Sequence, residues 1–404
     1  MTPNARQYHA AFAQELARLN PAQREAVEQL EGPVLVIAGP GTGKTHILAS
    51  RIGRILLETD AQAQNILCLT FTEAGVHAMR QRLLQLIGPE AHRVHIFTFH
   101  AFCNSVIQEN LAYFGRYNLE PLTELEQVEV LRSILEGLPL THPLRRGKVQ
   151  AHFYEGHLRQ LFQWMKAEAW TVERVLEAIE VYLAGLPDRP EYRYQRPSRK
   201  HKKGDLKESQ YEQERQRMEV LASAVRLFPD YEAALLQRGR YDYADMIRWV
   251  LGAFRDNQLL LRSYQEQYLY FLVDEYQDTN GAQNELIRQL AAYWESPNLF
   301  IVGDDDQSIF EFQGARLKNL VDYYLDFKDH IKVVLLQDNY RSNQAILDAA
   351  QALIQYNEQR ITKQLKRLAV DKKLRAAHPD RQQSTRRPCL RIYANPFQEA
   401  LGIL

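Results

Sequence analysis

Cysteine is scarce in this sequence, long apolar runs are missing, and each shortage excludes a class of protein. The 404 residues include three cysteines, Cys68, Cys103 and Cys389, too few and too scattered for a disulfide framework or a Cys-x-x-Cys metal site. No stretch approaches the ~18 uncharged apolar residues of a membrane span, and the first ten residues lack the apolar core of a signal peptide. We therefore expect a soluble, cytoplasmic protein with no membrane partner.

A net charge is also lacking, because 50 Lys and Arg residues balance 50 Asp and Glu residues. A neutral chain lacks the positive net charge that most simply indicates a nucleic-acid partner. Such a partner is still possible, because a local basic patch can supply the positive electrostatic potential. The composition, 45% apolar and 25% charged, is that of a globular protein, which excludes a disordered or fibrous chain. The length suggests about two or three domains.

Short apolar runs of strand length recur between helical patterns. They lie at residues 34–37, 66–71, 94–97, 268–273, 299–302 and 332–336. Each is rich in β-branched or aromatic residues and is followed by polar residues or glycine, as in parallel strands buried on both faces. The predicted fold class is α/β with a doubly wound sheet. Residues 108–238 show helical periodicity without convincing strands and are predicted to form a helical insertion.

A basic segment, residues 190–208, lies inside this insertion. Its cations outnumber the nearby acids Glu191 and Asp205; they are Arg193, Arg196, Arg199, Lys200, Lys202 and Lys203. A solvated, mobile loop has this composition, and so does a surface that contacts a phosphate backbone. The sequence leaves both interpretations open.

A glycine-rich loop follows the first apolar run and leads into a helical pattern. Its residues are Gly39, Pro40, Gly41, Thr42, Gly43, Lys44 and Thr45. In such a loop the backbone N–H groups point at a β-phosphate, the Lys44 ammonium bridges β- and γ-oxygens, and the Thr45 hydroxyl ligates Mg²⁺. The strict pattern has Gly where Ala38 stands. The loop predicts a site for a nucleoside triphosphate.

Two adjacent acids, Asp274 and Glu275, directly follow the apolar run at 268–273. Acids placed after a buried strand are costly unless they are used. We expect Asp274 to hold Mg²⁺ and Glu275 to orient and deprotonate an attacking water. Hydrolysis of ATP or GTP is the default chemistry, and phosphoryl transfer to a small acceptor is the alternative.

Seven motifs, in the family's order, resemble those of the UvrD/Rep/PcrA family of superfamily 1 DNA helicases. The matching segments, from the Q motif to motif IV, are 19–27, 38–45, 70–80, 97–102, 273–280, 301–310 and 337–342. The family's first motif begins with Ala, which accounts for Ala38. The resemblance implies a RecA-like P-loop NTPase domain in two parts, 1–107 and 239–328, around the insertion at 108–238. Residues 329–404 would then start a second RecA-like domain.

The resemblance also implies roles for single residues. Gln23 would read the adenine edge, Tyr340 would stack on adenine, and Gln307 would sense the γ-phosphate. Arg341 would act as an arginine finger. The residues implied to face single-stranded DNA are Phe71, Thr98, His100, Phe310 and Phe312.

Some of these roles have alternatives, and some positions depart from the family. Phe310 and Phe312, two residues apart after a strand, could instead be core residues. A lone histidine is more often structural, but the place of His100 in a Thr-Phe-His-Ala motif favours DNA contact. The family usually has Tyr where Phe310 stands and Arg where Gln313 stands. The missing guanidinium predicts a weaker grip on DNA at Gln313, with the fold unaffected.

The function implied is an ATP- and Mg²⁺-dependent helicase or translocase that moves 3′ to 5′ on single-stranded DNA and acts at junctions with duplex DNA. The motor of a helicase-nuclease and a nucleotide-gated DNA-binding module without translocation are the alternatives. Motifs V and VI of the family are absent, so we expect an N-terminal part of a larger helicase. Such a part would hydrolyse ATP slowly and unwind poorly alone. Repair or nuclease partners, or a fused nuclease domain, are further expectations.

Overall fold

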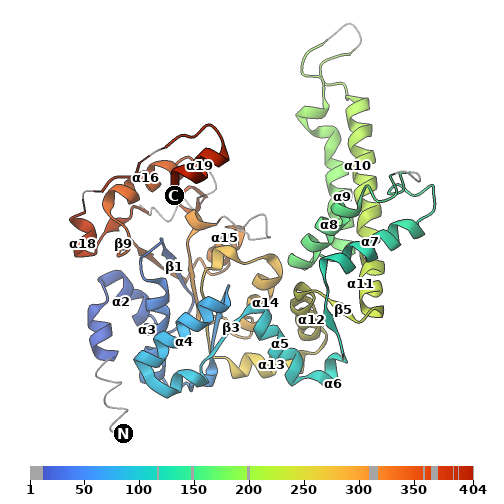
Figure 1. The fold of residues 1–404 in the computed structure, drawn as a ribbon. Coiled ribbons are helices and arrows are strands. Elements are labelled where there is room, and N and C mark those ends of the chain that lie inside the picture. Colours follow the sequence, from blue (N-terminus) through green and yellow to red (C-terminus); the bar gives the residue numbers. More distant parts are fainter. Residues whose placement is uncertain are drawn as a thin grey trace. The chain divides into compact units, whose positions relative to one another are not determined.

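The computed structural model describes residues 12–115, 118–146, 150–197, 201–308, 317–357, 360–364, 372–384, 386–389 and 391–403. The chain divides into two compact units (Figure 1). The first comprises Met1–Thr98, Arg262–Thr279 and Leu290–Leu404, and the second comprises Phe99–Leu261 and Asn280–Gln289. Each unit has its own hydrophobic core.

A six-stranded parallel sheet forms the centre of the first unit (Figure 1). In spatial order its strands are β3 (His95–Thr98), β2 (Ile66–Thr70), β6 (Tyr270–Val273), β7 (Leu299–Gly303), β1 (Val34–Ala38) and β8 (Lys332–Leu336). Every pair of neighbours is parallel. The predicted α/β class and its six strands are confirmed, each strand within two residues of its expected bounds.

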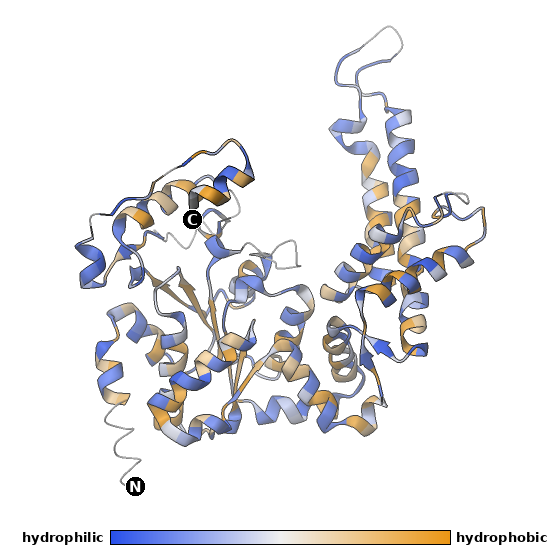
Figure 2. Cartoon of the chain, viewed as in Figure 1, coloured by the Kyte–Doolittle hydropathy of each residue, from blue (hydrophilic) through white to orange (hydrophobic). Residues whose placement is uncertain are grey.

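Both faces of the four inner strands of this sheet are buried. Side chains alternate between the faces of a strand, and one set, including Val36, Cys68 and Val302, packs on a cluster supplied by α2, α3 and α4. The alternate residues, such as Leu35 and Ile301, are also fully buried. The strands therefore stand out as hydrophobic in Figure 2, which is why they read as continuous apolar runs in the sequence.

Helices surround the sheet and build most of the second unit. Among the described residues, those of the first unit include α2 (Pro21–Glu28), α3 (Lys44–Glu58), α4 (Glu73–Ile87), α15 (Leu317–Asp326), α16 (Gln344–Ile354), α17 (Ile361–Gln364), α18 (Pro379–Gln382) and α19 (Pro396–Ile403). Helices α13 (Gln258–Gln267) and α14 (Gly281–Ala291) begin in the second unit and end in the first. Within the described residues, we find no helix with the length and apolarity to cross a membrane.

The second unit is mostly helical, as predicted for the insertion. Its elements are α5 (Phe99–Glu109), α6 (Leu111–Phe114), β4 (Glu120–Pro121), α7 (Glu124–Gly137), α8 (Glu155–Ala167), α9 (Val172–Gly185), α10 (Glu208–Arg226), α11 (Phe228–Gln237), β5 (Arg240–Tyr241) and α12 (Tyr243–Asp256). The buried Lys166 ammonium lies 2.6 Å from Asp242 and 2.8 Å from Asp245. Asp242 also caps α12, so this acidic stretch has a structural use at the return from the insertion.

Strand β8 lies beyond residue 329, where the second domain was expected to begin, and yet it belongs to the first sheet. Residues 332–336 were expected to open a second RecA-like domain, but they pair along their whole length with β1, as the edge of the first sheet. Past β8, the short strand β9 (Asp338–Asn339) pairs with β10 (Arg375–Ala376) in a separate two-stranded sheet. The first sheet therefore extends beyond residue 328, and the remaining division into domains stays a prediction.

Candidate nucleotide-binding and DNA-contacting sites

The phosphate loop, residues 39–45, joins strand β1 to helix α3. The backbone of Gly41 has φ +69°, and Gly43, the N-cap of α3, also has a positive φ. The Thr42 hydroxyl donates a hydrogen bond of 2.8 Å to the Gly39 carbonyl and stabilises the turn. The loop therefore presents backbone N–H groups at the positive end of a helix dipole, an arrangement that suits an anion.

Gly41 is required by both conformation and space. A Cβ added there would lie 2.6 Å from the Arg341 Cβ and 2.9 Å from the Asn339 Nδ2. We expect Gly41→Ala to lower the free energy of unfolding by about 1–2 kcal/mol from the left-handed backbone alone. Gly137→Ala is the matched control, because an added Cβ there meets open space. Thermal unfolding checks the prediction, and equal melting temperatures for the two variants would contradict it.

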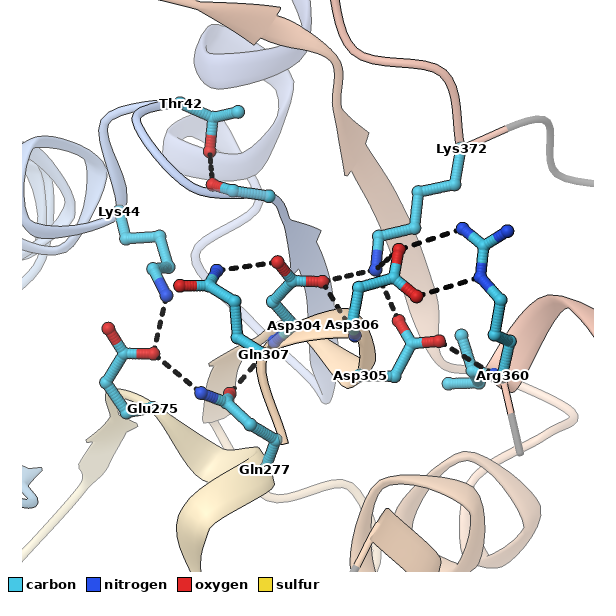
Figure 3. Close-up of polar contacts among 12 residues, drawn as sticks. Thr42, Lys44, Glu275, Gln277, Asp304, Asp305, Asp306, Gln307, Arg360 and Lys372 are labelled. Atoms are coloured by element: carbon cyan, nitrogen blue, oxygen red, sulfur yellow. Dashed lines mark hydrogen bonds and ion pairs between the residues drawn. The ribbon is translucent and has the colours of Figure 1, made fainter. Parts of the chain in front are cut away.

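Lys44 and Glu275 form an ion pair at the mouth of the phosphate loop. The Lys44 ammonium, on the first residue of α3, lies 2.5 Å from Glu275 Oε2 (Figure 3). Glu275 has φ +48°, although it is not a glycine, and its N–H donates to Asp274 Oδ1 at 2.9 Å. Strained backbone of this kind costs of order 1–3 kcal/mol and is concentrated at functional sites. The turn after β6 thus aims Glu275 at Lys44.

Asp274 is a buried carboxyl at the end of β6, with 8% of its surface exposed. Burial, reinforced by the neighbouring Glu275 charge, raises the pKa of Asp274 to about 6. A cation here would compensate the carboxylate, and carboxylate and hydroxyl oxygens are the donors that Mg²⁺ prefers. Thr45, the second residue of α3, is half-buried. The chemistry of this donor pair fits Mg²⁺.

A buried glutamine, Gln277, connects this pair to the loop after β7. Its Nε2 donates to Glu275 Oε2 at 2.8 Å, and its Oε1 accepts from the Asp304 backbone N–H at 2.9 Å. In turn, Gln307 Nε2 donates to Asp304 Oδ2 at 2.6 Å (Figure 3). A continuous polar chain therefore runs from Lys44 to Gln307.

The three acids after β7 form a largely buried cluster. Asp304 and Asp305 are buried, and ligand atoms of all three, with Asp306, lie within 4.8 Å of one another. The Lys372 ammonium contacts Asp304, lies 2.5 Å from Asp305 and lies 3.0 Å from Asp306. Burial opposes the charge on Lys372, but these carboxylates outweigh it and raise the pKa of Lys372. An internal cation thus occupies the centre of the acidic cluster.

Arg360 completes this cluster. Its guanidinium binds Asp306 through two hydrogen bonds of 2.8 Å, the bidentate geometry typical of arginine and carboxylate. Neither Arg360 nor Lys372 was expected to belong to the site. They lie 54 and 68 residues from their partners and outside the recognised motifs, so no local pattern could have marked them.

The segment after β8 lies directly over the phosphate loop. The Asn339 side chain donates to the Pro40 carbonyl, and the Tyr340 N–H donates to the Gly41 carbonyl at 2.9 Å. Asn339 Oδ1 also accepts the Arg341 N–H at 2.9 Å. The structure therefore places Arg341 beside the phosphate loop, and Asn339, a residue not singled out in the sequence, holds it there.

Gln23 and Tyr340 also lie beside the phosphate loop. Gln23 Nε2 donates to the Thr42 carbonyl at 2.9 Å, and Gln23 Oε1 accepts the Asn20 N–H at 3.2 Å. Asn20 Nδ2 donates to the Tyr340 hydroxyl at 3.1 Å. The Q motif and motif IV are thus joined, with the Tyr340 ring partly exposed beside them.

The residues expected to contact DNA fall into three groups. Phe71 directly follows β2 and Thr98 ends the adjacent β3, so both lie at the carboxyl edge of the sheet. His100 lies in the second unit on α5, where its ring packs edge-on against Tyr243 with centroids 6.1 Å apart. Burial lowers the pKa of His100, although Asp242 opposes this. Phe310, Phe312 and Gln313 lie outside the described residues.

The segments that form these sites also match known proteins. Residues 19–328 match the family model of the UvrD/REP helicase N-terminal domain. ATP-dependent DNA helicase PcrA of Bacillus subtilis (strain 168) is 31% identical over 353 residues, which cover 87% of this chain and 41% of the relative. PcrA of Staphylococcus aureus (strain Mu50) is 28% identical over 87% of this chain and 42% of its own length. The chain spans about two fifths of these relatives. The phosphate loop, the acidic pair and motif IV meet at one sheet edge, and the first two lie within the matched residues. The chain belongs to the UvrD/REP helicase N-terminal domain family.

Proposed function

We propose that this chain is the ATP-binding part of a DNA helicase motor, which couples ATP hydrolysis to movement on single-stranded DNA. One observation supports the proposal most directly. The Lys44–Glu275 pair, at the phosphate loop, has Arg341 on the segment that covers the same loop. A lysine for phosphate, an acid for water and an arginine for developing charge are the groups that phosphoryl transfer needs.

Each group has a separable action in this proposal. The Lys44 ammonium leaves Glu275 and binds phosphate oxygens, which frees the Glu275 carboxylate to take a proton from water. Gln307 and Arg341 contact the γ-phosphate and stabilise the charge that spreads over it. Mg²⁺, when held by Asp274 and Thr45, would neutralise charge on the phosphate oxygens. Gln23 and Tyr340 would bind the adenine.

The proposal is tested by ATP hydrolysis with and without single-stranded DNA, using Lys44→Ala as control. We expect slow hydrolysis by the 404-residue chain, stimulation by DNA, and no activity in the variant. DNA binding that responds to ATP without any hydrolysis would favour the nucleotide-gated module instead. Robust unwinding by this chain alone would contradict the expectation that it is a weak motor by itself.

The polarity and the surroundings of the motor are proposed on the family resemblance. We infer movement from 3′ to 5′ and action at junctions of single-stranded and duplex DNA. The direction is tested by asking whether the protein displaces a bound block from the 3′ end or from the 5′ end of a single DNA strand. A cytoplasmic location would suit the free thiols of Cys68 and Cys103.

The basic segment of the second unit gives a second surface for DNA in this proposal. Residues 193–206, here named the basic arm, are closed at the base by a bridge between Arg193 and Leu206. Tyr194 exchanges backbone hydrogen bonds of 2.9 Å with Asp205 and Gly204, so the arm begins and ends as a hairpin. Arg193 is used internally, since its guanidinium donates to the carbonyls of Pro187 and Gly204. The base of the arm is therefore held by backbone and side-chain hydrogen bonds.

The described cations beyond that base face solvent. Arg196, Lys202 and Lys203 are exposed, while Arg199 and Lys200 lie outside the described residues. The first half of α10, which follows the arm, is hydrophilic in Figure 2. Exposed cations on a hairpin suit the phosphate backbone, which binds without regard to sequence.

Replacing Arg196, Lys202 and Lys203 together with Ala is expected to weaken DNA binding and flatten its salt dependence. For single-stranded DNA the slope of log K against log salt should fall in magnitude by up to about 2, since each lost phosphate contact removes about 0.7. The matched control replaces three exposed cations of α10, Arg215, Arg217 and Arg226. Fluorescence anisotropy at several salt concentrations measures both. Equal slopes for the two triple variants would count against the arm as a DNA contact.

A further inference from the structure

The segment of residues 372–376, here named the bridging segment, touches three elements of the candidate ATP site. Lys372 contacts the acids after β7, Leu374 packs on the phosphate loop, and Arg375 and Ala376 form β10 beside β9. These contacts all lie within the first unit. They make the bridging segment a physical link between groups that are far apart in the sequence.

The first contact links Lys372 to Gln307 through Asp304. Asp304 is fully buried, and its two carboxylate oxygens have different partners: Oδ1 binds the Lys372 ammonium, and Oδ2 accepts from Gln307 Nε2 at 2.6 Å (Figure 3). A buried carboxylate that loses its cation cannot stay charged in the same place. The orientation of Gln307 therefore depends on Lys372, through Asp304.

The other contacts link the bridging segment to Arg341 through Asn339. Leu374 lies so close to the phosphate loop that a Cβ added at Gly39 would be 2.8 Å from Leu374 Cδ2. The Ala377 N–H, just past β10, donates to the Asn339 carbonyl at 2.8 Å. Asn339 in turn holds the N–H of Arg341. A shift of the bridging segment would therefore move Arg341 as well as Gln307.

We propose that Lys372 is a positioning residue that keeps Gln307 and Arg341 in register, so that both reach the same γ-phosphate. The inference rests on the proposed function, because it assigns Lys372 to the ATP site of that motor. Lys372 itself touches no phosphate in this scheme. It acts through Asp304 on one side and through the bridging segment on the other.

This role of Lys372 predicts different effects on the affinities for ADP and for ATP. ADP lacks the γ-phosphate, so its affinity depends on the phosphate loop and not on the alignment of Gln307 and Arg341. ATP and its non-hydrolysable analogue AMP-PNP do depend on that alignment. Loss of Lys372 should therefore affect recognition of the third phosphate and leave ADP binding nearly unchanged.

The experiment compares the 404-residue chain with Lys372→Met, Lys372→Arg and Lys373→Met. Lys373 is the adjacent, exposed lysine and serves as the matched control. Affinities for ADP and AMP-PNP are measured by titration, and ATP turnover is measured with saturating Mg²⁺ and single-stranded DNA. Circular dichroism verifies that each variant is folded.

We expect Lys372→Met to reduce the preference for AMP-PNP over ADP by about tenfold, and to reduce kcat by about tenfold. The reason is that Gln307 and Arg341, which stabilise the charge of the transition state, lose their alignment. ADP affinity should change by less than about twofold. Lys372→Arg should recover part of both losses, and Lys373→Met should match the parent chain. An unchanged nucleotide preference in folded Lys372→Met, or a parallel loss of ADP binding, would overturn the proposal.

A charge-matched variant covers the case in which Lys372→Met does not fold. Lys372→Met combined with Asp305→Asn removes one anion together with the cation, and it leaves Asp304 without its ammonium. It should show the same loss of γ-phosphate preference, and full preference in this variant would overturn the inference. Failure of the proposed function is distinguishable, because the parent chain itself would then neither bind ADP nor hydrolyse ATP.

Discussion

Replacing Glu275 with Gln is expected to tighten ATP binding by about tenfold while hydrolysis falls by about a thousandfold. The Lys44 ammonium is paired with Glu275 at 2.5 Å, and this pair must open before Lys44 can bind a phosphate. The side chains are 11% and 34% exposed, so the pair is partly shielded from water. Glutamine keeps the shape, removes the competing charge and cannot accept the proton from water.

The two effects are measured separately on the same protein. Equilibrium titration with ATP at low temperature reports affinity, and phosphate release reports hydrolysis. Glu90→Gln is the control, because Glu90 is an exposed acid of the same unit, with 60% of its side chain accessible. Hydrolysis at the parental rate would remove Glu275 from the role of general base. Unchanged affinity would show that the ion pair does not compete with ATP.

Replacing Asp274 with Asn is expected to stabilise the free protein and to abolish Mg²⁺-dependent hydrolysis. Burial and the Glu275 charge hold the pKa of Asp274 at about 6, so the folded chain bears an unfavourable charge at neutral pH. A rise of about two pKa units corresponds to about 3 kcal/mol. Asparagine is neutral, and its carbonyl can still accept the Glu275 N–H. It is a poor ligand for Mg²⁺ compared with a carboxylate.

The sign of the pH dependence follows from the raised pKa. Asp274 loses its proton near pH 4 in the unfolded chain and near pH 6 in the folded chain. Its favourable contribution to stability is therefore complete below about pH 4 and is lost as the pH rises to about 6. The advantage of Asp274→Asn should be absent below about pH 4, grow up to about pH 6 and stay constant above about pH 7.

Thermal unfolding in EDTA, from pH 4 to pH 8, measures this difference between the variant and its parent. Asp60→Asn, an exposed acid in the same unit, should show no comparable effect. Addition of Mg²⁺ and ATP should reverse the order, because only the parent gains a bound metal. A variant that is less stable than its parent at pH 8 without metal would contradict the account of Asp274.

Much of the fold could be predicted because its signals are local. The four inner strands are buried on both faces and the edge strands β3 and β8 mainly on one, yet each appears as an apolar run, and β8 was found as readily as β1. Its place was harder to predict. Whether residues 332–336 close the first sheet or open a second domain depends on which strand they pair with. They pair with β1, which is distant in the sequence, so no local pattern could show it.

The candidate site divides in the same way. Lys44 and Glu275 were predicted together because parallel strands bring their carboxyl ends to one edge, where a loop after β1 meets a turn after β6. The Gln277 bridge was not predicted, although it lies within a recognised motif, because a glutamine has no distinctive pattern. The acids after β7 surround an internal lysine in the fold, a pairing that no local pattern in the sequence indicates.

The sequence by itself determined the strands, the phosphate loop and the family, since apolar periodicity, glycine positions and short motifs depend on neighbours along the chain. Only the tertiary structure decided which charges neutralise one another. Asp304 is satisfied by Lys372 and Asp306 by Arg360 because folding brings distant segments into one buried cluster. Burial makes such pairing obligatory, since an unpaired charge in the interior is too costly to keep. The partner that meets this need is set by the path of the chain in space.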